Sequence, residues 1–599
     1  MKALTGQRTP KRRPLPEKVQ RWHYIVRAFQ ILDNETSQFD LIVIGAGING
    51  AGIARDAAMR GLRVLLLDKG DIGGGTSSWS TRLIHGGLRY LEHGELRLVR
   101  ESLRERETLL SIAPHLVRPL SLLVPVYKNA RRGIWTIRAG MFAYDALSLN
   151  KSLPGHRLLS SAETLREVPA LKVDGLLGAA NYFDAQVEFP ERLVLENVLS
   201  AVAHGAQVLT YARVDKLLVD EGTVRGVQFS RLLSQGREAQ DRVAHGKEGG
   251  LALALNEAIA PVVINAAGPW VDQIFDNSSV DSERLIGGTK GSHIIVAPFS
   301  GAPSKAIYVE AETDGRPFFI IPWNDKYLIG TTDIRFDGNP DEARITSDEI
   351  DYLLHGTNQV LPAAKLTRAQ ILFAYSGVRP LAYTTQRAAQ KITRRHFIRP
   401  HPQIANLFSI VGGKLTTYRS LAEQAVDTVF KTLGQAPRAC STAQDPLPGA
   451  ASAFFFGFCH RFKRRSPLSP ATNDRLLRTY GTRSDLILKL VGQDQSLAEV
   501  FDTETGALAA EIVLAFTLEF ATTLSDCLLR RTMVGLNSTC GLNAIEAAGR
   551  IAQQQLGWSD DRLTQEIATY QHQVRVKFLS LLGTPEDKER VRPYQNREP

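Results

Sequence analysis

The sequence predicts an α/β fold with a Rossmann-like dinucleotide-binding domain, an inserted antiparallel sheet and a helical C-terminal domain. A glycine-rich turn between an apolar strand and a helix at residues 41–60 predicts the first part. Alternating strands between residues 285 and 400 predict the sheet, and helical spacing of Leu, Ile and Ala at 473–492 and 507–555 predicts the helices. A chain of 599 residues is long enough for about two or three such domains.

The glycine-rich turn is the most specific local signal. Apolar residues 41–44 have the length and branching of a buried parallel strand, and the pattern G-x-G-x-x-G follows at Gly45, Gly47 and Gly50. Gly45 permits the tight turn, Gly47 lets the backbone approach a pyrophosphate, and Gly50 lets helix and strand pack closely. Asp68 ends the next apolar strand, where a carboxylate would accept hydrogen bonds from ribose hydroxyls. We therefore expect a dinucleotide site here.

The chain divides into three predicted parts. Residues 1–37 are rich in basic residues and proline, which predicts an irregular extension. Residues 38–440 are expected to form the dinucleotide-binding domain, with an inserted substrate-binding sheet at about 116–180 and 285–400. Residues 441–599 are expected to form the helical C-terminal domain, a cap.

Two further segments have the composition of ligand-binding loops. Glycines and small hydroxyl residues crowd the loop 73–80, and HGGLRY at 85–90 places a cation and an aromatic ring beside two glycines. Farther on, the apolar strand 407–411 runs into GGKLTTYR at 412–419, a glycine turn that opens a helix. Because a basic side chain and a helix N-terminus both favour anions, we expect this segment at a ligand.

Composition narrows the class of protein. A hydrophobic content of 43% and a charged content of 22% are typical of a soluble globular protein, and no apolar run predicts a transmembrane helix. The beginning of the chain does not have the pattern of a secretory signal. Its four cysteines show no metal-ligand or C-x-x-C spacing, so we expect a reducing compartment and no metal site. The net charge of +10 suits an anionic substrate, an anionic membrane surface or nucleic acid. No zinc-finger or RNA-binding signature supports nucleic acid.

A series of motifs in this order resembles the FAD-dependent glycerol-3-phosphate dehydrogenases, a family of the D-amino-acid-oxidase-like (GR2-type) flavoproteins. The motifs are VIGAGINGAGIARDAAMRGL, TSSWSTRLIHGGLRYLE, NAAGPWV, KGSHIIV, IPWNDKYLIGTTD, YSGVRPL and GGKLTTYRSLAE, and they cover roughly residues 38–430. RTYGTRSDLIL and LRRT are similar to the C-terminal cap domain of that family. Because the C-terminus has no EF-hand loop, the resemblance is to the shorter aerobic bacterial enzymes.

The resemblance implies an activity and a location. It implies an FAD enzyme that oxidises sn-glycerol 3-phosphate to dihydroxyacetone phosphate, with a hydride passing from C2 to flavin N5 and electrons passing to a membrane quinone. Such an enzyme would be cytoplasmic and bound peripherally to the cytoplasmic face of the inner membrane. The basic and aromatic residues at 128–144 and the basic run 460–465 could contact an anionic membrane, although solvated basic faces are an equal alternative. The oligomeric state stays open, with a homodimer as one option.

The resemblance also assigns site residues. His293 would be the base, which suits a side chain whose pKa lies near neutrality, and Arg89, Arg379 and Lys414 would complete the catalytic set. Several cations must converge on a phosphomonoester because it carries nearly two negative charges. The expected substrate-binding residues are Arg89, Tyr90, Thr332, Arg379, Arg394 and Lys414. The expected cofactor-binding residues are Gly45, Gly47, Ile48, Asn49, Gly50, Asp68, Thr76, Ser77, Ser78, Arg82, Leu83, His85, Gly86, Gly87, Val214, Ala267, Gly268, Trp270, Gly413, Lys414, Leu415 and Thr416.

Other interpretations stay open for single residues and for the function. His293 could be structural, Arg379 could form a loop salt bridge, and Arg394 could belong to a solvated basic cluster. The chain could be an oxidase that passes electrons from the same substrate to oxygen, or a flavin-dependent dehydrogenase of a 2-hydroxy acid or an amine. It could also be a flavin-containing membrane-bound binding protein without turnover. Several convergent cations favour a phosphate over a single carboxylate.

Overall fold

The computed structural model describes residues 38–128, 130, 132–148, 151–232, 253–276, 283–384 and 392–582. The predicted extension 1–37 therefore lies outside the described residues, as does Arg131 of the segment 128–144. Side chains are not described for Arg89, His93, Leu232, Leu253 and Ala254.

A six-stranded sheet contains the dinucleotide turn. Its strands, in spatial order, are β18 (Phe397–Pro400), β19 (Leu407–Val411), β11 (Val263–Asn265), β1 (Leu41–Ile44), β2 (Val64–Leu67) and β7 (Gln207–Leu209). All neighbours are parallel except β18 and β19. The residues of β1 and β2 are buried throughout, as expected for strands covered on both faces.

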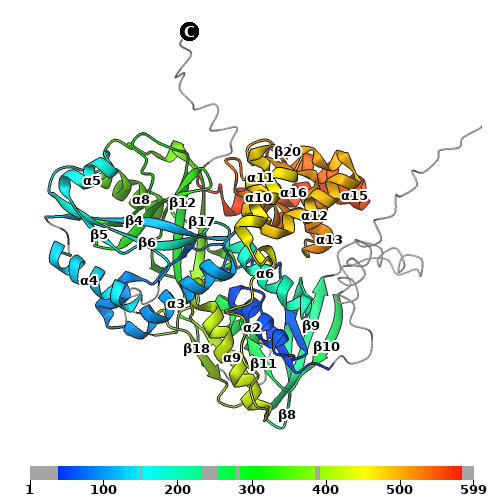
Figure 1. Ribbon diagram of the computed structural model, residues 1–599. Helices are drawn as coiled ribbons and strands as arrows, with labels where there is room; N and C mark the ends of the chain where they lie inside the picture. The colour runs from blue at the N-terminus through cyan, green and yellow to red at the C-terminus, as the bar shows by residue number, and fades with distance from the viewer. Residues whose placement is uncertain are drawn as a thin grey trace, which may run out of the picture.

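Each face of this sheet has its own cover. On one face, helices α2 (Ile48–Met59), α6 (Pro190–Ala203) and α9 (Tyr418–Thr432) share a hydrophobic core with the sheet. On the other face, a three-stranded antiparallel sheet packs against it, formed by β8 (Ala212–Asp220), β9 (Thr223–Leu232) and β10 (Leu253–Ile259). Figure 1 shows this layered arrangement at the bottom of the molecule.

A second, ten-stranded sheet is built from segments far apart in the chain. Its strands are β3 (Leu83–Ile84), β4 (Val117–Tyr127), β5 (Arg157–Ser160), β6 (Leu176–Val187), β12 (Thr289–Val296), β13 (Ala306–Glu310), β14 (Pro317–Trp323), β15 (Lys326–Gly330), β16 (Ile334–Arg335) and β17 (Ile371–Arg379). The prediction of an antiparallel sheet holds for every pair except β4 and β13, which are parallel. These two strands come from separate insertions and no hairpin joins them, so sequence pattern could not set their direction.

Helices flank the large sheet. They are α3 (Leu96–Ile112), α4 (Ile134–Leu147), α5 (Ser161–Glu167) and α8 (Ser347–Val360). A capping box fixes the start of α8, in which the side chains of Thr346 and Glu349 each bond the backbone of the other residue. The fold class predicted from the sequence is confirmed in its main lines: a Rossmann-like sheet, a second sheet and a helical C-terminal part.

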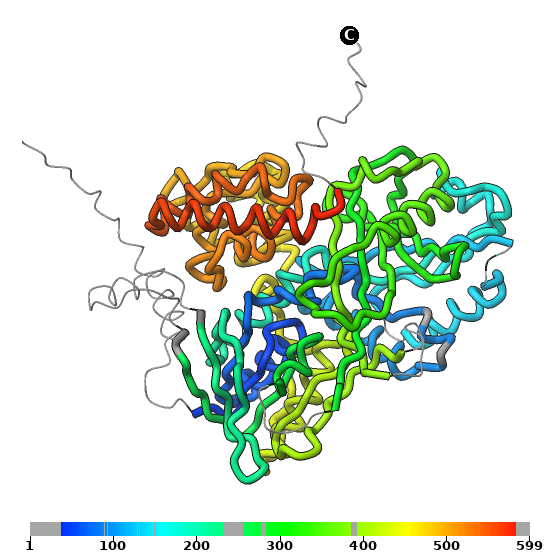
Figure 2. Tube along the Cα trace, turned by 180° about the vertical axis from the view of Figure 1, so that it is seen from behind, coloured from blue at the N-terminus to red at the C-terminus, as the bar shows by residue number. Residues whose placement is uncertain are grey.

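The C-terminal part is a helical bundle that contacts both the dinucleotide-binding part and the large sheet. Its main helices are α10 (Phe455–Arg465), α11 (Pro470–Tyr480), α12 (Ser484–Gln493), α13 (Ala509–Leu518), α15 (Ile545–Leu556) and α16 (Asp560–Lys577); α14 (Leu524–Asp526) and a short pair, β20 (Val500–Asp502) and β21 (Ala507–Leu508), complete it. Figure 2 shows α16 running across this part toward the large sheet. There the backbone N–H of Ala374 donates to the carbonyl of Phe578 at 3.1 Å.

Buried ion pairs hold this part in place. Arg531 lies 2.7 Å from Asp71, and Arg192 lies 2.6 Å from Glu519, with every side chain almost fully buried. Both pairs join residues of the dinucleotide-binding part to the C-terminal helices. Within the described ranges, no helix is both long enough and apolar enough to cross a membrane.

Candidate active site

The turn between β1 and α2 leaves a helix N-terminus open. Gly45 has a φ of +103°, and a Cβ there would lie 2.7 Å from the carbonyl oxygen of Ala266. Gly47 is the N-cap of α2 and has no side chain with which to cap the helix. At Gly50 a Cβ would lie 1.8 Å from the carbonyl oxygen of Gly45. The backbone therefore excludes larger side chains at both positions and presents the uncapped helix end as a ready anion site.

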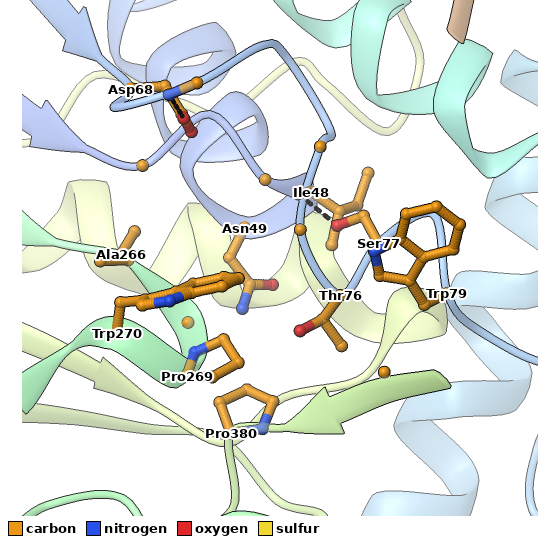
Figure 3. Close-up of a pocket in the computed structure, with 18 of the residues that line it drawn as sticks. Ile48, Asn49, Asp68, Thr76, Ser77, Trp79, Ala266, Pro269, Trp270 and Pro380 are labelled. Carbon is orange, nitrogen blue, oxygen red and sulfur yellow. Dashed lines mark hydrogen bonds between the residues drawn. The ribbon is translucent and has the colours of Figure 1, made fainter. Parts of the chain in front are cut away.

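Asp68 and Ser77 fix the two sides of this turn. One carboxylate oxygen of Asp68 accepts from the backbone N–H of Ala46 at 2.6 Å, and the other accepts from that of Gly70 at 2.8 Å. Burial raises the pKa of Asp68, although these two hydrogen bonds oppose the shift. The hydroxyl of Ser77 accepts from the N–H of Ile48 at 3.0 Å, as Figure 3 shows. The turn is thus held rigid by its own neighbours.

One cavity of about 1140 Å³ connects this turn with the large sheet. It extends past Asp68 and Val214 on the side of the six-stranded sheet, and past His293 and Arg379 on the side of the large sheet. Trp270, Pro269 and Pro380 form a wall opposite the start of α2 (Figure 3). The predicted cofactor residues all line this cavity except Gly50, Ser78, Gly86 and Gly87.

These exceptions shape the loops around the cavity. The hydroxyl of Ser78 donates to the carbonyl of Gly73 at 2.6 Å, so it is used within its own loop. A Cβ at Gly86 would lie 2.5 Å from the Tyr144 hydroxyl, and one at Gly87 would lie 2.2 Å from the Tyr90 ring. Their contact with the cofactor therefore stays a prediction, and the two glycines allow close packing against Tyr144 and Tyr90.

Arg82 also has an internal role. Its guanidinium is fully buried, lies 2.8 Å from the Glu191 carboxylate and stacks over the Trp323 ring at 4.5 Å. This guanidinium supports the cavity wall through its bidentate pair with Glu191, although its Nε has no hydrogen-bond partner among the described residues.

The residues of this cavity fit FAD. The uncapped start of α2 suits a pyrophosphate, and Asp68 stands where ribose hydroxyls are expected. The side-chain oxygen of Asn49 is buried beside the turn and has no hydrogen-bond partner among the described residues, so a ligand donor could satisfy it. Gly413 lies against Asn49, where a Cβ would come within 3.2 Å of its amide nitrogen.

His293 lies in β12 on the large sheet. Its Nε2 is 3.0 Å from the Thr81 hydroxyl, and its ring centre is 4.8 Å from that of Tyr375. Burial, with the nearby charges of Arg379 and Arg82, holds the pKa of His293 well below its usual value. His293 is therefore neutral near pH 7 and can accept a proton.

Two arginines meet on one carboxylate beside His293. Arg379, the last residue of β17, donates to one oxygen of Asp333 at 3.0 Å, and Arg394 donates to the other at 3.0 Å. Arg379 also donates to the Thr331 hydroxyl at 3.0 Å. The solvated-cluster interpretation of Arg394 is wrong, since only 8% of this residue is exposed.

Lys414 belongs to a different group. Its ammonium donates to the Ser102 hydroxyl at 2.8 Å and lies 4.7 Å from the centre of the Tyr90 ring. Burial lowers the pKa of Lys414 to about 8. The predicted set thus divides into the pair Arg379 and Arg394 and the pair Lys414 and Tyr90, all lining the cavity. The side chain of Arg89 lies outside the described residues.

Thr332 does not line the cavity. Its hydroxyl is buried and donates to Glu349 at 2.7 Å, while its carbonyl accepts from Arg379 at 3.2 Å. The prediction that its side chain binds substrate is therefore not supported, and Thr332 instead holds a cation in place.

Sequence reasoning missed three features of the site. Asp333 ends the motif IPWNDKYLIGTTD, but no separate sequence signal indicated its shared carboxylate. Thr81 gave no separate signal beside its many hydroxyl neighbours. Arg530 and Lys577 line the cavity from the C-terminal helices, and only tertiary contacts bring them there.

The fold and this cavity define an FAD-dependent oxidoreductase. The family described as FAD dependent oxidoreductase matches residues 40–419, and the C-terminal domain of alpha-glycerophosphate oxidase matches residues 440–563. The chain belongs to the glycerol-3-phosphate dehydrogenases within that class, as its relatives show.

Three relatives span nearly the whole chain. The glycerol-3-phosphate dehydrogenase of Synechocystis is 45% identical and covers 90% of this chain and 96% of its own length. The aerobic glycerol-3-phosphate dehydrogenase of Escherichia coli is 38% identical over 88% of this chain and 99% of its own. The glycerol-3-phosphate dehydrogenase of Bacillus halodurans, solved with FAD, is 27% identical with a TM-score of 0.72, over 93% of this chain and 98% of its own.

Proposed function

We propose that this enzyme oxidises sn-glycerol 3-phosphate to dihydroxyacetone phosphate and passes the electrons to a membrane quinone. One observation carries the proposal. A neutral histidine, His293, lines the same cavity as two arginines, Arg379 and Arg394, that share a single carboxylate. A proton acceptor beside paired guanidiniums suits an alcohol that carries a phosphate.

The two arginines would bind the phosphate. Guanidinium groups match phosphate oxygens in pairs, and partial burial strengthens their attraction for a dianion. Lys414 and Tyr90 would bound the substrate from the other side of the cavity, where the lysine adds a further positive charge. A 2-hydroxy acid, with one carboxylate, would not need both groups.

His293 would take the proton of the C2 hydroxyl. Its depressed pKa keeps the imidazole unprotonated, and the Thr81 hydroxyl at Nε2 fixes the ring orientation. Bound FAD would supply the acceptor for the two electrons that leave C2 as a hydride. Trp79, which lines the cavity, and Tyr375, which packs against the His293 ring, would limit access of water to the reacting carbon.

Anaerobic reduction of the bound flavin tests this function. Glycerol 3-phosphate should bleach the flavin absorbance of the wild type. His293→Ala should lower the rate of reduction by about 10²–10⁴-fold, as expected for loss of a general base. Arg379→Ala should mainly raise the concentration of glycerol 3-phosphate at which flavin reduction reaches half of its maximal rate. If the wild-type flavin is not reduced, the proposed function is wrong.

Aerobic turnover without added acceptor separates a dehydrogenase from an oxidase. If one molecule of hydrogen peroxide forms for each molecule of substrate consumed, the electrons pass to oxygen. That result would contradict a quinone as the electron acceptor. A quinone analogue should instead restore turnover when oxygen is removed.

Two helices support peripheral contact with a membrane. Trp135 and Phe142 of α4 are 73% and 66% exposed, and Arg138 stacks on Trp135. Phe456 of α10 is 72% exposed, and the basic run 460–465 lies in the same helix. Exposed aromatic residues beside cations suit an anionic bilayer surface, where a membrane quinone would be within reach.

Vesicle sedimentation tests this contact. A variant that carries both Trp135→Ser and Phe456→Ser should bind more weakly than the wild type to vesicles that contain anionic lipid. Leu255→Ser, which alters an apolar residue of β10 that is 63% exposed, is the matched control. Equal binding by all three proteins would rule out these helices as the contact.

A further inference from the structure

We propose that Asp333 is a positioning residue that holds Arg379 and Arg394 together as one receptor for the phosphate of the substrate. The inference rests on the proposed function, because that function makes these arginines phosphate ligands. It adds a residue that no part of the sequence reasoning assigned to the site.

The carboxylate of Asp333 bridges the two arginines. One carboxylate oxygen accepts from Nη1 of Arg379 and the other from Nη2 of Arg394, each at 3.0 Å. The side chains of Asp333 and Arg394 are only 12% and 10% exposed. Because these side chains are largely buried, a shared carboxylate fixes both guanidiniums more firmly than a surface ion pair would.

Arg394 keeps one donor group for a ligand. Its Nη1 is buried and has no hydrogen-bond partner anywhere in the described part of the chain, although the residue lines the cavity. An unpartnered buried donor is costly, and an oxygen of a bound phosphate would satisfy it. Nη1 of Arg394 is therefore a donor without a protein partner within the described ranges, beside the pair that Asp333 holds.

The charge balance suits a phosphate. Two adjacent guanidiniums repel each other, and the carboxylate between them offsets that repulsion. The group as a whole keeps one positive charge, with further attraction from Lys414 elsewhere in the cavity. A dianion gains from this arrangement, while an uncharged polyol does not.

A buried network fixes the backbone that carries Asp333. The neighbouring Thr332 donates to Glu349 at 2.7 Å, and Glu349 forms an ion pair with Lys290 at 2.9 Å. The hydroxyl of Ser292 donates to the same carboxylate at 2.8 Å. Asp333 is thus set at the end of a rigid strand pair.

The two arginines should depend on Asp333 unequally. Arg379 has further acceptors in the Thr331 hydroxyl and the Thr332 carbonyl. Among the residues that the structure describes, Asp333 is the only side chain that accepts a hydrogen bond from Arg394. Coupling between Asp333 and Arg394 should therefore be the stronger of the two.

A double-mutant cycle tests this coupling. Asp333→Asn is made alone and in the Arg394→Ala and Arg379→Ala backgrounds, and kcat, the KM for glycerol 3-phosphate and the inhibition constant of inorganic phosphate are measured. Alone, Asp333→Asn should raise the KM and the phosphate inhibition constant about tenfold and change kcat by less than about threefold. In the Arg394→Ala background, the same substitution should change the KM by less than about threefold.

The control is Asp351→Asn, which removes another aspartate–arginine pair, with Arg368, on an exposed surface away from the cavity. It should leave both constants unchanged. Asp333→Glu keeps the charge but displaces it, so it should fold and bind FAD like the wild type and still weaken phosphate. Flavin content and thermal unfolding are recorded for every variant.

Two results would overturn the inference: unchanged phosphate binding in Asp333→Asn and Asp333→Glu, or an equal loss with and without Arg394. Failure of the proposed function is distinct. In that case glycerol 3-phosphate would not reduce the wild-type flavin, while binding of inorganic phosphate to the holoenzyme, followed by flavin fluorescence, would still test the role of Asp333.

Discussion

The two ends of the cavity are built in different ways. At the dinucleotide end, a single continuous segment provides a glycine turn, a helix start and the acid Asp68. At the substrate end, His293 and Arg379 come from two strands of the large sheet, while Asp333 and Arg394 come from two connecting segments, so tertiary structure brings them to one place.

The difference lies in what each end uses to bind. The first end would bind the pyrophosphate through backbone groups, so its requirement is local shape, and glycine satisfies it. The second end would bind through charged side chains that other side chains hold, as in the ion pairs of Asp333 with Arg379 and Arg394. Damage to the first end should therefore remove the cofactor, and damage to the second should change substrate constants while the cofactor stays.

Gly50→Ala should produce the largest effect. Alanine normally favours a helix over glycine by about 1 kcal/mol, but here the new Cβ would overlap the carbonyl oxygen of Gly45 at 1.8 Å. The helix must shift, so we expect loss of bound flavin and a stability loss of about 1–3 kcal/mol. Flavin content and chemical denaturation measure both. Gly492→Ala, in open space on α12, is the control and should be neutral or slightly stabilising. Normal flavin content in Gly50→Ala would contradict a shape requirement.

Gly291→Ala should act on the substrate end alone. A Cβ at Gly291 would lie 2.2 Å from Nη2 of Arg379 and 2.5 Å from the Thr331 hydroxyl, so the guanidinium must move. We expect a rise in the KM for glycerol 3-phosphate of about tenfold with flavin content unchanged. Steady-state kinetics in wild-type and Arg379→Ala backgrounds measure it. An equal rise in both backgrounds would show that the methyl group does not act through Arg379.

Lys414→Arg should have the smallest effect, visible only at high pH. Burial lowers the pKa of Lys414 to about 8, so its positive charge is lost as the pH rises through 8, while an arginine stays charged. Between pH 7 and 9, the KM of the wild type should rise about threefold more than that of the variant. If KM changes with pH in the same way in the wild type and in Lys414→Arg, this role for Lys414 is wrong.

The same shift affects stability with a definite sign. Folded Lys414 releases its proton near pH 8, whereas the unfolded residue keeps it to about 10.5. The cost of the buried charge is therefore fully present below pH 8 and is relieved as the pH rises toward 10.5. Lys414→Arg should therefore lack the increase in unfolding free energy that the wild type shows between about pH 8 and 10.5.

Much of the fold could be predicted because its signals are local. The strand, glycine and helix pattern at 41–60 placed β1 and α2, and the acid at the end of β2 was found by spacing alone. The direction of β13 against β4 could not be predicted, since no short turn joins them. The site residues carried over by resemblance line the cavity with few exceptions, and Thr332 and Ser78 are exceptions because each hydroxyl found a nearer internal acceptor.

By itself, the sequence determined the cofactor end and the residue types available for chemistry. Its glycines encode the turn through backbone sterics, which need no distant partner. Only the tertiary structure decided which cations act together. Asp333 joins Arg379 to Arg394, while Lys414 turns to Ser102 and Tyr90. The reason is physical: an ion pair depends on the distance between two side chains, and residues 46 to 61 positions apart acquire that distance only when the sheet has formed.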